Sequence, residues 1–540
     1  MAEEDGVKKP ALLCLCFGVV LSFPGTRAYG LAGSTGPGGA NAQAVHELGL
    51  IGSDIKIGLV AATNVYANHE AFFDKDVNGA PTGATHAFNY DFTGAGILPF
   101  DHDTWMAGIA ISTGGVLHPN DIGVAPGAEV HCGRIAIDTN SSTIWIENAL
   151  TNLIDVQGCR VIMTGVSFGG DPDGQSLLTL MYDYYAYSRD VVFAIAAGNG
   201  GSVIWVVGDA YNGITTGGAV TDGDDVYDRV GSASGSGTTT DGRQKPDVVA
   251  PSNMLTLPHS GTSTWYVPPF DNGPTSLSEP HTAGVAALLL GFADQTPNTN
   301  DEEKEVIKAV IVNSVFPNIY AKSGASTNPL DPNNVWHAHR GFGAIDAFRA
   351  YEVLAAGQVF TNTPTSEDKG WAYETMTSKT QVDHYFVQAL KNDRLVLTVT
   401  WNREVTKNGS LQYSDEAPPK FRVNLAIKDS NGVTLRSESD SLNNLKKIEI
   451  MLPRDDTYEI VLTNPNTKRD RTYAMAFELV PPLVADFDLN YVVDNADLGF
   501  IVANWLQSGT DADLAGEGHV NFRDFAVFAA NWGNDNPLYH

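Results

Sequence analysis

The sequence predicts an α/β domain with a parallel sheet covered by helices on both faces, then an antiparallel β-sandwich, then a small helical calcium-loop module. The first part is predicted because apolar runs such as IKIGLVAA, RVIMTGV and VVFAIAA alternate with helical patterns over residues 48–355. The second is predicted because alternating strands with turn signals fill residues 357–480. An internal repeat in residues 484–540 predicts the third.

The composition narrows the classes of function. The chain has 540 residues, 43% of them hydrophobic, and a formal net charge of -30. At roughly 100–200 residues per domain, this length holds several domains that each bury a core. The excess of acid excludes a general nucleic-acid or anionic-membrane binder, because such proteins need basic faces. Cations are the expected electrostatic partners.

The first 28 residues have the pattern of a signal peptide. Lys8 and Lys9 precede an apolar run over residues 11–23, and small residues follow up to Ala28. Thirteen apolar residues are too few to span a bilayer, which needs about 20. We expect a secreted or cell-envelope protein without a membrane span in the mature chain; an uncleaved anchor is the alternative.

Two cysteines, Cys132 and Cys159, lie outside the leader. They permit one disulfide or two buried thiols, and the sequence leaves both open.

Three polar residues in the α/β region have the chemistry that acyl transfer requires. His102 opens the helical pattern HDTWMAGIAI, Asn199 follows the strand VVFAIAAG, and Ser276 opens the helix in PTSLSEPHTAGVAALLL. A serine at a helix N-terminus supplies a nucleophile, a histidine takes its proton, and a side-chain amide binds the developing oxyanion.

Taken in order, these segments resemble the subtilases, the subtilisin-like serine peptidases, whose motifs are H-G-T-H-V-A-G, A-A-G-N and G-T-S-M-A-x-P-H-V-A-G. The resemblance covers roughly residues 48–355 and includes GVAPGAEV, VSFGG and DGRQKPDVVAP. It implies a subtilisin-like fold and a secreted endopeptidase that acts through an acyl-enzyme. It assigns Ser276 as nucleophile, His102 as base and Asn199 as oxyanion residue. It also implies that Ser167, Phe168 and Gly169 line the substrate cleft.

A second Gly-Thr-Ser, at residues 261–263, is rejected as the nucleophile motif. Ser263 is followed by Thr-Trp-Tyr rather than by Pro-His and a helix, so it lacks the context that activates a serine.

The family's third catalytic residue is missing. The aspartate of D-[ST]-G should end the first strand, but Ala61 or Ala62 occupies that position. Asp54 lies too early, and Glu70 belongs to a surface segment. That carboxylate holds the histidine tautomer, so we expect an impaired peptidase; the alternative is an inactive pseudopeptidase that serves as a calcium-stabilised peptide- or protein-binding scaffold.

Three further departures surround the site. Pro274 replaces the glycine before Thr-Ser, Trp105 replaces the second histidine of the motif, and Glu279 introduces an acid beside the nucleophile. The fixed φ of proline predicts altered loop geometry near Ser276, and Glu279 predicts a nearby charge.

Two loops in residues 484–540 have the rhythm of EF-hands, in which oxygen ligands at places 1, 3, 5, 9 and 12 surround calcium. The second copy follows the first by 27 residues, and Ala515 removes its ligand at place 3. We therefore expect calcium to bind the first loop more strongly. The predicted ligands are Asp486, Asp488, Asn490, Asp494, Asp497, Asp513, Glu517, Asn521 and Asp524.

These paired half EF-hands resemble dockerins, which implies a cohesin-like partner; a calcium-stabilised cap is the alternative. The preceding sandwich is similar to the pre-peptidase C-terminal or P-domain-like modules of exported peptidases.

Overall fold

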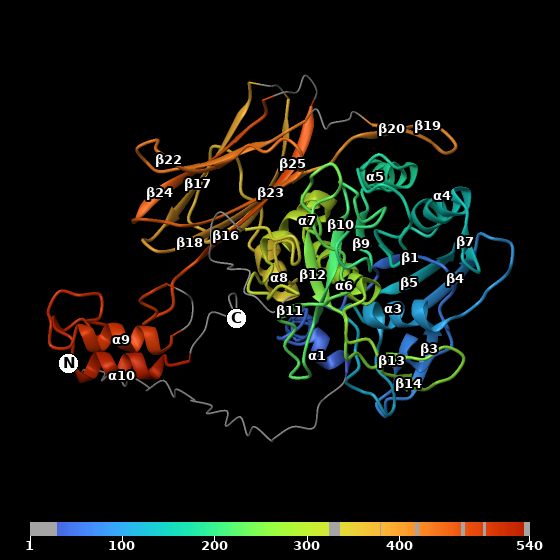
Figure 1. The fold of residues 1–540 in the computed structure, drawn as a ribbon, viewed down its shortest axis with the longest axis horizontal. Coiled ribbons are helices and arrows are strands. Elements are labelled where there is room, and N and C mark those ends of the chain that lie inside the picture. Colours follow the sequence, from blue (N-terminus) through green and yellow to red (C-terminus); the bar gives the residue numbers. More distant parts are fainter. Residues whose placement is uncertain are drawn as a thin grey trace, which may run out of the picture.

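The computed structural model describes residues 30–322, 335–377, 380–415, 421–465, 470–489 and 493–533. The predicted signal peptide, residues 1–28, and the predicted ligand Asn490 lie outside the described residues. Figure 1 shows a domain of strands and helices, a β-sandwich beside it, and the two helices α9 and α10.

A sheet of eight strands forms the centre of the first domain, in the order β11-β10-β9-β8-β1-β5-β4 with β12 also paired to β10. Its strands pair in parallel except β11. They are β1 Lys56–Ala61, β4 Ala87–Asp91, β5 Glu129–Arg134, β8 Val161–Thr164, β9 Val192–Ala196, β10 Ile214–Val220, β11 Arg229–Val230 and β12 Val248–Pro251.

Helices cover both faces of this sheet. Along β1, Leu59 packs in a cluster that contains Met106 and residues of α6, whereas Val60 packs with Leu150 and Met181 of α4 and α5. Successive side chains of a strand point to opposite faces, so the apolar run of β1 is buried on both sides. The helices are α1 Leu31–Thr35, α2 Ala42–His46, α3 Asp101–Ile111, α4 Thr143–Thr151, α5 Leu177–Arg189, α6 Thr275–Ala293, α7 Lys304–Asn313 and α8 Ala347–Ala355.

Short elements complete this domain. They are β2 Phe73–Lys75, β3 Pro81–Thr85, β6 Ala136–Ile137, β7 Asn140–Ser141, β13 Leu257–Pro258, β14 Trp265–Tyr266, the 3-10 turns Glu70–Phe72 and Thr299–Glu302, and a π-helical turn at Asn152–Val156.

The strand order creates a switch point at β1. β1 is the first strand in sequence, with β5 on one side of it and β8 on the other. Ligands of open α/β sheets bind at the carboxyl ends of the strands where the order reverses. The segments that begin at Ala62, Gly165 and Ala197 leave β1, β8 and β9 at this edge.

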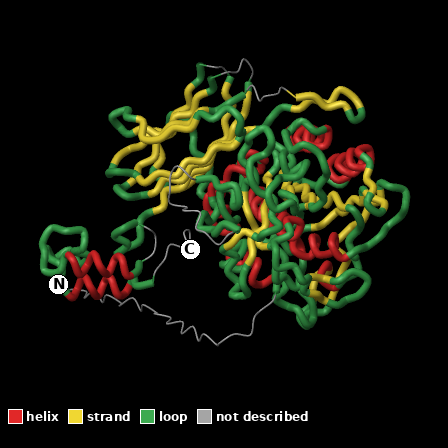
Figure 2. The backbone as a smooth tube through the Cα atoms, viewed as in Figure 1, coloured by secondary structure: helices red, strands yellow, loops and turns green. Residues whose placement is uncertain are grey.

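Two sheets, antiparallel apart from the short parallel pair β15–β17, form the predicted sandwich (Figure 2). One contains β15 Pro364–Thr365, β17 Val382–Ala389, β24 Asp456–Thr463, β21 Asn424–Lys428 and β22 Thr434–Glu438. The other contains β16 Lys369–Met376, β25 Arg471–Val480, β18 Arg394–Trp401 and β23 Leu445–Met451, and a hairpin, β19 Val405–Gly409 and β20 Gln412–Asp415, extends along α5.

The sandwich shares buried surface with the first domain. Every residue of β18 is buried, because one face of the strand lies in the sandwich core and the other packs against α7. Trp371 of β16 packs in the core of the first domain, and its Nε1 donates a hydrogen bond to the Leu354 carbonyl at 2.9 Å. The four-stranded sheet therefore has two buried faces instead of the one that alternation predicts.

The C-terminal repeat is visible in the structure. α9 Asn495–Ala503 and α10 Phe522–Ala530 have the same length, and both begin with a capping box, formed by Asp494 and Asp497 in one and by Asn521 and Asp524 in the other. Both helices are drawn together in Figure 2. The recurrence found in the sequence thus corresponds to two copies of one loop-helix unit.

Among the described helices, none has the length and apolar character that crossing a membrane requires. Cys132 and Cys159 are free and buried, which decides between the two alternatives in favour of thiols. Burial raises the pKa of Cys159 to about 12.

Candidate active site

His102 lies in the first turn of α3, whose N-cap is Phe100. Its side chain is 36% exposed, so one edge of the imidazole faces solvent. The next turn of the helix is buried and anchors it in the domain core through Met106 and Ala107. The helix thus presents an accessible ring from a fixed backbone.

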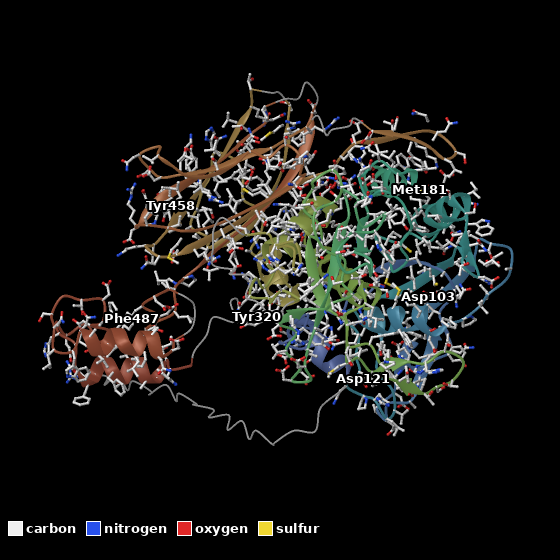
Figure 3. The ribbon with its side chains drawn as sticks, viewed as in Figure 1. Asp103, Asp121, Met181, Tyr320, Tyr458 and Phe487 are labelled. Carbon is white, nitrogen blue, oxygen red and sulfur yellow. The ribbon has the colours of Figure 1, made fainter. Side chains whose placement is uncertain are left out.

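Asp103 holds the inner side of this imidazole. The Nδ1 atom of His102 lies 3.0 Å from Oδ1 of Asp103, whose side chain is 1% exposed and is labelled in Figure 3. The other carboxylate oxygen, Oδ2, accepts the backbone N–H of Thr63 at 2.8 Å and also the Thr63 hydroxyl. The carboxylate is therefore bonded on both sides at the carboxyl end of β1.

The contact between His102 and Asp103 moves their two pKa values in opposite directions. Burial alone lowers the pKa of His102, but the hydrogen bond and the charge of Asp103 outweigh it and raise that pKa above its ordinary 6.5. Burial raises the pKa of Asp103, whereas His102 and the two Thr63 donors together lower it below its ordinary value. The geometry therefore favours an ionised Asp103 facing an imidazole of increased basicity.

Ser276 lies in the first turn of α6 and is 5% exposed. The chain enters this helix through Gly273, at φ +75°, and Pro274, the N-cap, at φ −66°. Pro274 therefore has the φ that its ring requires, while the glycine before it takes the left-handed conformation. Pro274 fits this entry to α6 with an unstrained backbone.

α3 and α6 pack against each other near these two residues. A methyl group on Gly165, the residue after β8, would clash with the Met106 sulfur and lie 3.3 Å from Cβ of Ser276. Leu277 packs in one small apolar cluster with Trp105 and Ile109 of α3. The start of α6 and the first turns of α3 are therefore neighbours at the switch point of the sheet.

Asn199 reaches the same place from the end of β9. Its Oδ1 accepts the backbone N–H of Thr275 at 2.8 Å and the Thr275 hydroxyl at 3.0 Å. Because the carbonyl oxygen is held by Thr275, the Nδ2 amide is directed to the other side. The backbone N–H of Ser276 belongs to the first turn of α6, where amides lack intrahelical acceptors. These two donors are the kind that stabilise an oxyanion.

Glu279 is buried one turn further along α6. One oxygen accepts the Thr164 N–H at 2.8 Å, and the other, Oε2, is buried without a hydrogen-bond partner. Burial raises the pKa of this carboxyl well above its ordinary value, which favours the neutral acid over the charge expected from the sequence. Burial likewise lowers the pKa of His281 to about 3.

The predicted substrate segment follows β8. Ser167, Phe168 and Gly169 lie in the loop after β8, in which Phe168 makes a single antiparallel bridge to Val206. Gly169 is exposed, and a Cβ there would meet nothing within 4 Å. The stretch leaves room on this side for another extended chain.

Ser263 belongs to a hairpin rather than to the start of a helix. It is exposed in the turn between β13 and β14. The following strand carries Tyr266, whose ring stacks on Trp105 at 6.1 Å between centroids. Trp105 therefore supports this hairpin, in the place where the motif of the family has its second histidine.

Four positions of the sequence relate to the missing strand carboxylate. Ala61 ends β1 and is buried in the cluster that includes Met106, and Ala62 follows it. Asp54 is exposed before β1, and Glu70 accepts hydrogen bonds from Trp265 Nε1 and the Val116 amide. Among the described residues, no hydrogen bond or ion pair joins either acid to His102.

Sequence reasoning missed Asp103. A signal was present, because the motif of the family has glycine directly after its histidine, whereas this chain has aspartate. Adjacent side chains on a helix normally point in different directions, so the sequence alone gives no reason to pair them.

In the C-terminal module, ligand atoms of Asp486, Asp488 and Asp497 lie within 4.8 Å of one another. Asp494 caps α9, and Asn490 is outside the described residues. In the second loop, Asp524 accepts the amides of Ala515 and Asn521, and Asp513 accepts those of Glu517 and Gly518. Within the described part of the chain, three carboxylates come together in the first loop but not in the second.

The chain is similar to several known proteins. Residues 78–344 match the model of the Subtilase family. Subtilisin of Bacillus pumilus is 29% identical over 286 residues, which are 51% of this chain and 90% of the relative. A thermophilic serine proteinase of Bacillus sp. (strain AK1) is 33% identical over 37% of this chain and 46% of the relative.

Pyrolysin of Pyrococcus furiosus is 27% identical over 43% of this chain and 18% of the relative. The matches thus span less than half the length of these last two relatives. Among solved structures, the prenylagaramide maturation protease PagA aligns with a TM-score of 0.43 at 17% identity, over 58% of this chain and 98% of the other.

The fold is an α/β domain built on a mostly parallel sheet. Residues 78–344 thus match a subtilase family domain, and subtilisins are among the homologues of the chain.

Proposed function

We propose that the protein is a secreted subtilisin-like serine endopeptidase. The observation that supports the proposal is that Oδ1 of Asn199 bonds Thr275 directly before Ser276, at the start of a helix, α6, that packs against the His102 helix α3. Subtilisin-like relatives support the same reading.

The side chains have defined tasks in this reaction. Oγ of Ser276 attacks the peptide carbonyl while Nε2 of His102 accepts its proton, and the Asn199 amide with the Ser276 N–H binds the oxyanion. His102 then donates that proton to the leaving amine, which departs as the C–N bond breaks. Water, deprotonated by His102, attacks the acyl-enzyme, and the acid product and free Ser276 result.

The substrate class is an extended peptide. The substrate backbone adds along residues 167–169 by main-chain hydrogen bonds, as in β-augmentation. Phe168 holds this stretch to the body of the domain through its bridge to Val206.

Peptide hydrolysis by purified protein tests the proposal. Ser276→Ala should abolish turnover of a quenched fluorescent peptide and labelling by a fluorophosphonate. Ser263→Ala, which alters the exposed serine of the other Gly-Thr-Ser, is the matched control and should retain both. Equal rates for wild type and Ser276→Ala would instead support the alternative, a pseudopeptidase that binds peptides, which the alanines at positions 61 and 62 favour.

We also propose that calcium binds the C-terminal loops, first through Asp486, Asp488 and Asp497, whose grouping supports it. Hard cations such as calcium prefer six to eight oxygen ligands. Calorimetric titration of the full chain with calcium chloride, after chelation, should show saturable binding; heats no larger than those with the Asp486→Asn variant would reject the first loop.

The same module is proposed to dock a cohesin-like partner. Val502, Leu506 and Phe522 are 63%, 70% and 78% exposed, an unusual apolar surface for so small a module. Purified cohesin modules should bind in the presence of calcium and lose affinity for Leu506→Asp. No binding by any cohesin would favour the stabilising-cap alternative.

A further inference from the structure

The imidazole of His102 is oriented although the strand aspartate is absent. The position at the end of β1 is alanine, and the space there is occupied by a carboxylate from α3. The carboxylate belongs to the residue next to the histidine itself.

We propose that Asp103 is the positioning residue of His102, and that Thr63 fixes its carboxylate at the carboxyl end of β1 in place of the missing strand aspartate. This inference rests on the proposed function for its kinetic consequence, but the His102–Asp103 contact can be tested without turnover.

The contact between Asp103 and His102 gives the first reason for this proposal. Oδ1 of Asp103 lies 3.0 Å from Nδ1 of His102, so the proton on Nδ1 is donated to the carboxylate. That leaves Nε2 with a lone pair directed away from Asp103. A base that faces a serine hydroxyl needs this tautomer.

The donors that hold the Asp103 carboxylate give the second reason for this proposal. Thr63 supplies two donors to Oδ2, and both come from the segment directly after β1. A buried carboxylate with these donors is held in one orientation and stays ionised. The strand end thus contributes donors, and the helix contributes the acid; the family motif has the acid on the strand.

Local sterics make this arrangement possible. Ala61 is fully buried against the α3 side of the sheet. Because Asp103 is bonded to Thr63 directly after β1, an aspartate at the end of this strand would add a second carboxylate to the same region, and two carboxylates in one buried site repel each other. The alanine and Asp103 are therefore complementary substitutions.

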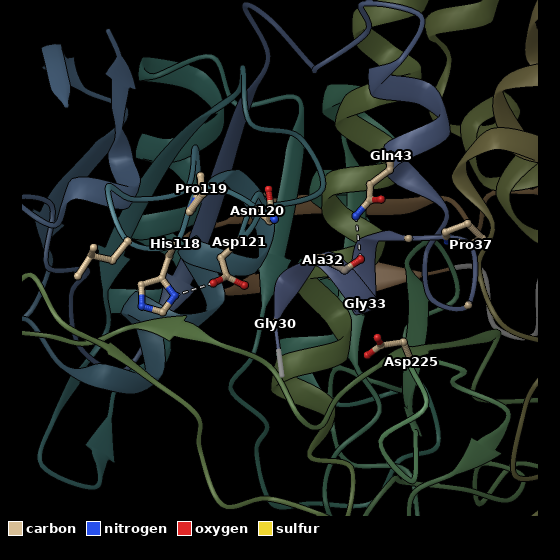
Figure 4. A pocket seen from close by; sticks show the side chains of 13 residues that line it. Gly30, Ala32, Gly33, Pro37, Gln43, His118, Pro119, Asn120, Asp121 and Asp225 are labelled. Carbon is tan, nitrogen blue, oxygen red and sulfur yellow. Dashed lines mark hydrogen bonds and ion pairs between the residues drawn. The ribbon is translucent and has the colours of Figure 1, made fainter. Parts of the chain in front are cut away.

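A second histidine–carboxylate pair whose acid is buried provides a matched control. In the loop after α3, Nδ1 of His118 lies 2.9 Å from Oδ2 of Asp121, beside a cavity of about 450 Å³ that residues 30–43 help to line (Figure 4). Asp121 is 7% exposed. It resembles Asp103 in burial and partner, but it belongs to another site.

The test compares Asp103→Asn with Asp121→Asn. Loss of the oriented tautomer should reduce kcat/KM at neutral pH by about 10³–10⁴-fold, with an intact fold by circular dichroism. Because Asp103 raises the pKa of His102, the acid limb of the pH-rate profile should move to lower pH in Asp103→Asn. Asp121→Asn should leave the limb unchanged.

A relocated carboxylate should rescue the reaction. Asp103→Gly combined with Ala61→Asp, or with Ala62→Asp, restores the arrangement of the family motif. Recovery of at least 10-fold over Asp103→Gly alone would show that the histidine requires the carboxylate rather than this particular residue.

A titration separates this inference from the proposed function. The His102 pKa, followed by NMR with His102→Gln for assignment, should fall in Asp103→Asn even if the wild-type protein hydrolyses nothing. No turnover with a lowered pKa would reject the peptidase and retain the positioning role. An unchanged His102 pKa and an unchanged rate in Asp103→Asn would overturn the inference.

Discussion

Arg403, just beyond the end of β18 in the sandwich, forms a buried ion pair with Asp183 of α5 in the α/β domain. Their side chains are 1% and 0% exposed. The guanidinium also donates to the Gly174 carbonyl at 2.8 Å and lies 4.3 Å from the centre of the Tyr211 ring. A charged side chain of the sandwich is thus buried inside the α/β domain, close to the loop that follows the proposed substrate segment.

Arg403→Met should destabilise the whole protein. It leaves Asp183 as a buried charge that has lost its cation, and breaking such a pair costs about 3–5 kcal/mol. The measurement is the midpoint of denaturant unfolding. Arg454→Met is the control, because that arginine is 46% exposed in its pair with Asp429 and such pairs contribute about 0–1 kcal/mol. Equal effects of the two variants would show that the interface tolerates the loss.

Glu279→Gln should stabilise the protein at alkaline pH and change little at acidic pH. The pKa of Glu279 is raised in the folded state, so its contribution is fully present below the unfolded pKa of about 4.3 and is lost as pH rises through the folded value. Glutamine keeps the acceptor for the Thr164 amide but has no charge to bury. Melting temperatures of both proteins from pH 4 to 9 measure this. A difference that does not grow with pH would contradict a buried neutral acid.

Gly273→Ala should damage activity more than Gly261→Ala. Both glycines have positive φ, +75° and +76°, so each alanine costs about 1–2 kcal/mol of backbone strain. At Gly273 the new Cβ would also lie 2.9 Å from Cα of Gly231, whereas at Gly261 it meets nothing within 4 Å. Because Gly273 leads into the Ser276 helix, kcat should fall at least 10-fold there alone. Similar kcat values for both variants would show that the loop adapts.

The two proposed calcium loops should respond oppositely to the loss and the gain of a carboxylate at place 3. Asp488→Ala removes a carboxylate from the three-acid group of the first loop and should weaken its calcium affinity at least 10-fold. Ala515→Asp supplies the missing ligand at an exposed position of the second loop and should strengthen binding there. Calorimetry of the full chain with calcium reports both affinities. A first loop unaffected by Asp488→Ala would reject that residue as a ligand.

Much of the fold follows from local pattern. The apolar strands of the first domain lie between two helical layers, so their uninterrupted hydrophobicity predicts a parallel sheet, and Ser276 and His102 are found at helix starts as their motifs indicate. The repeat is likewise readable, because each copy carries its own cap and helix.

What the sequence could not predict depends on contacts between distant segments. Nothing local shows that β18 is buried on both faces, since its second face is covered by α7 from another domain. The charge state of Glu279 also needs its surroundings. Asp103 was missed for a related reason: its partner Thr63 is 40 residues away in sequence, and family motifs direct attention to the strand.

The adjacency of His102 and Asp103 has a consequence for genome surveys. Two consecutive codons encode the histidine and the carboxylate bonded to it, whereas the family motif divides such a pair between two segments that can mutate independently. A survey that scores homologues as dead when the strand aspartate is absent would discard this chain. Reading the codon after the histidine would recover it, together with any relative that made the same exchange.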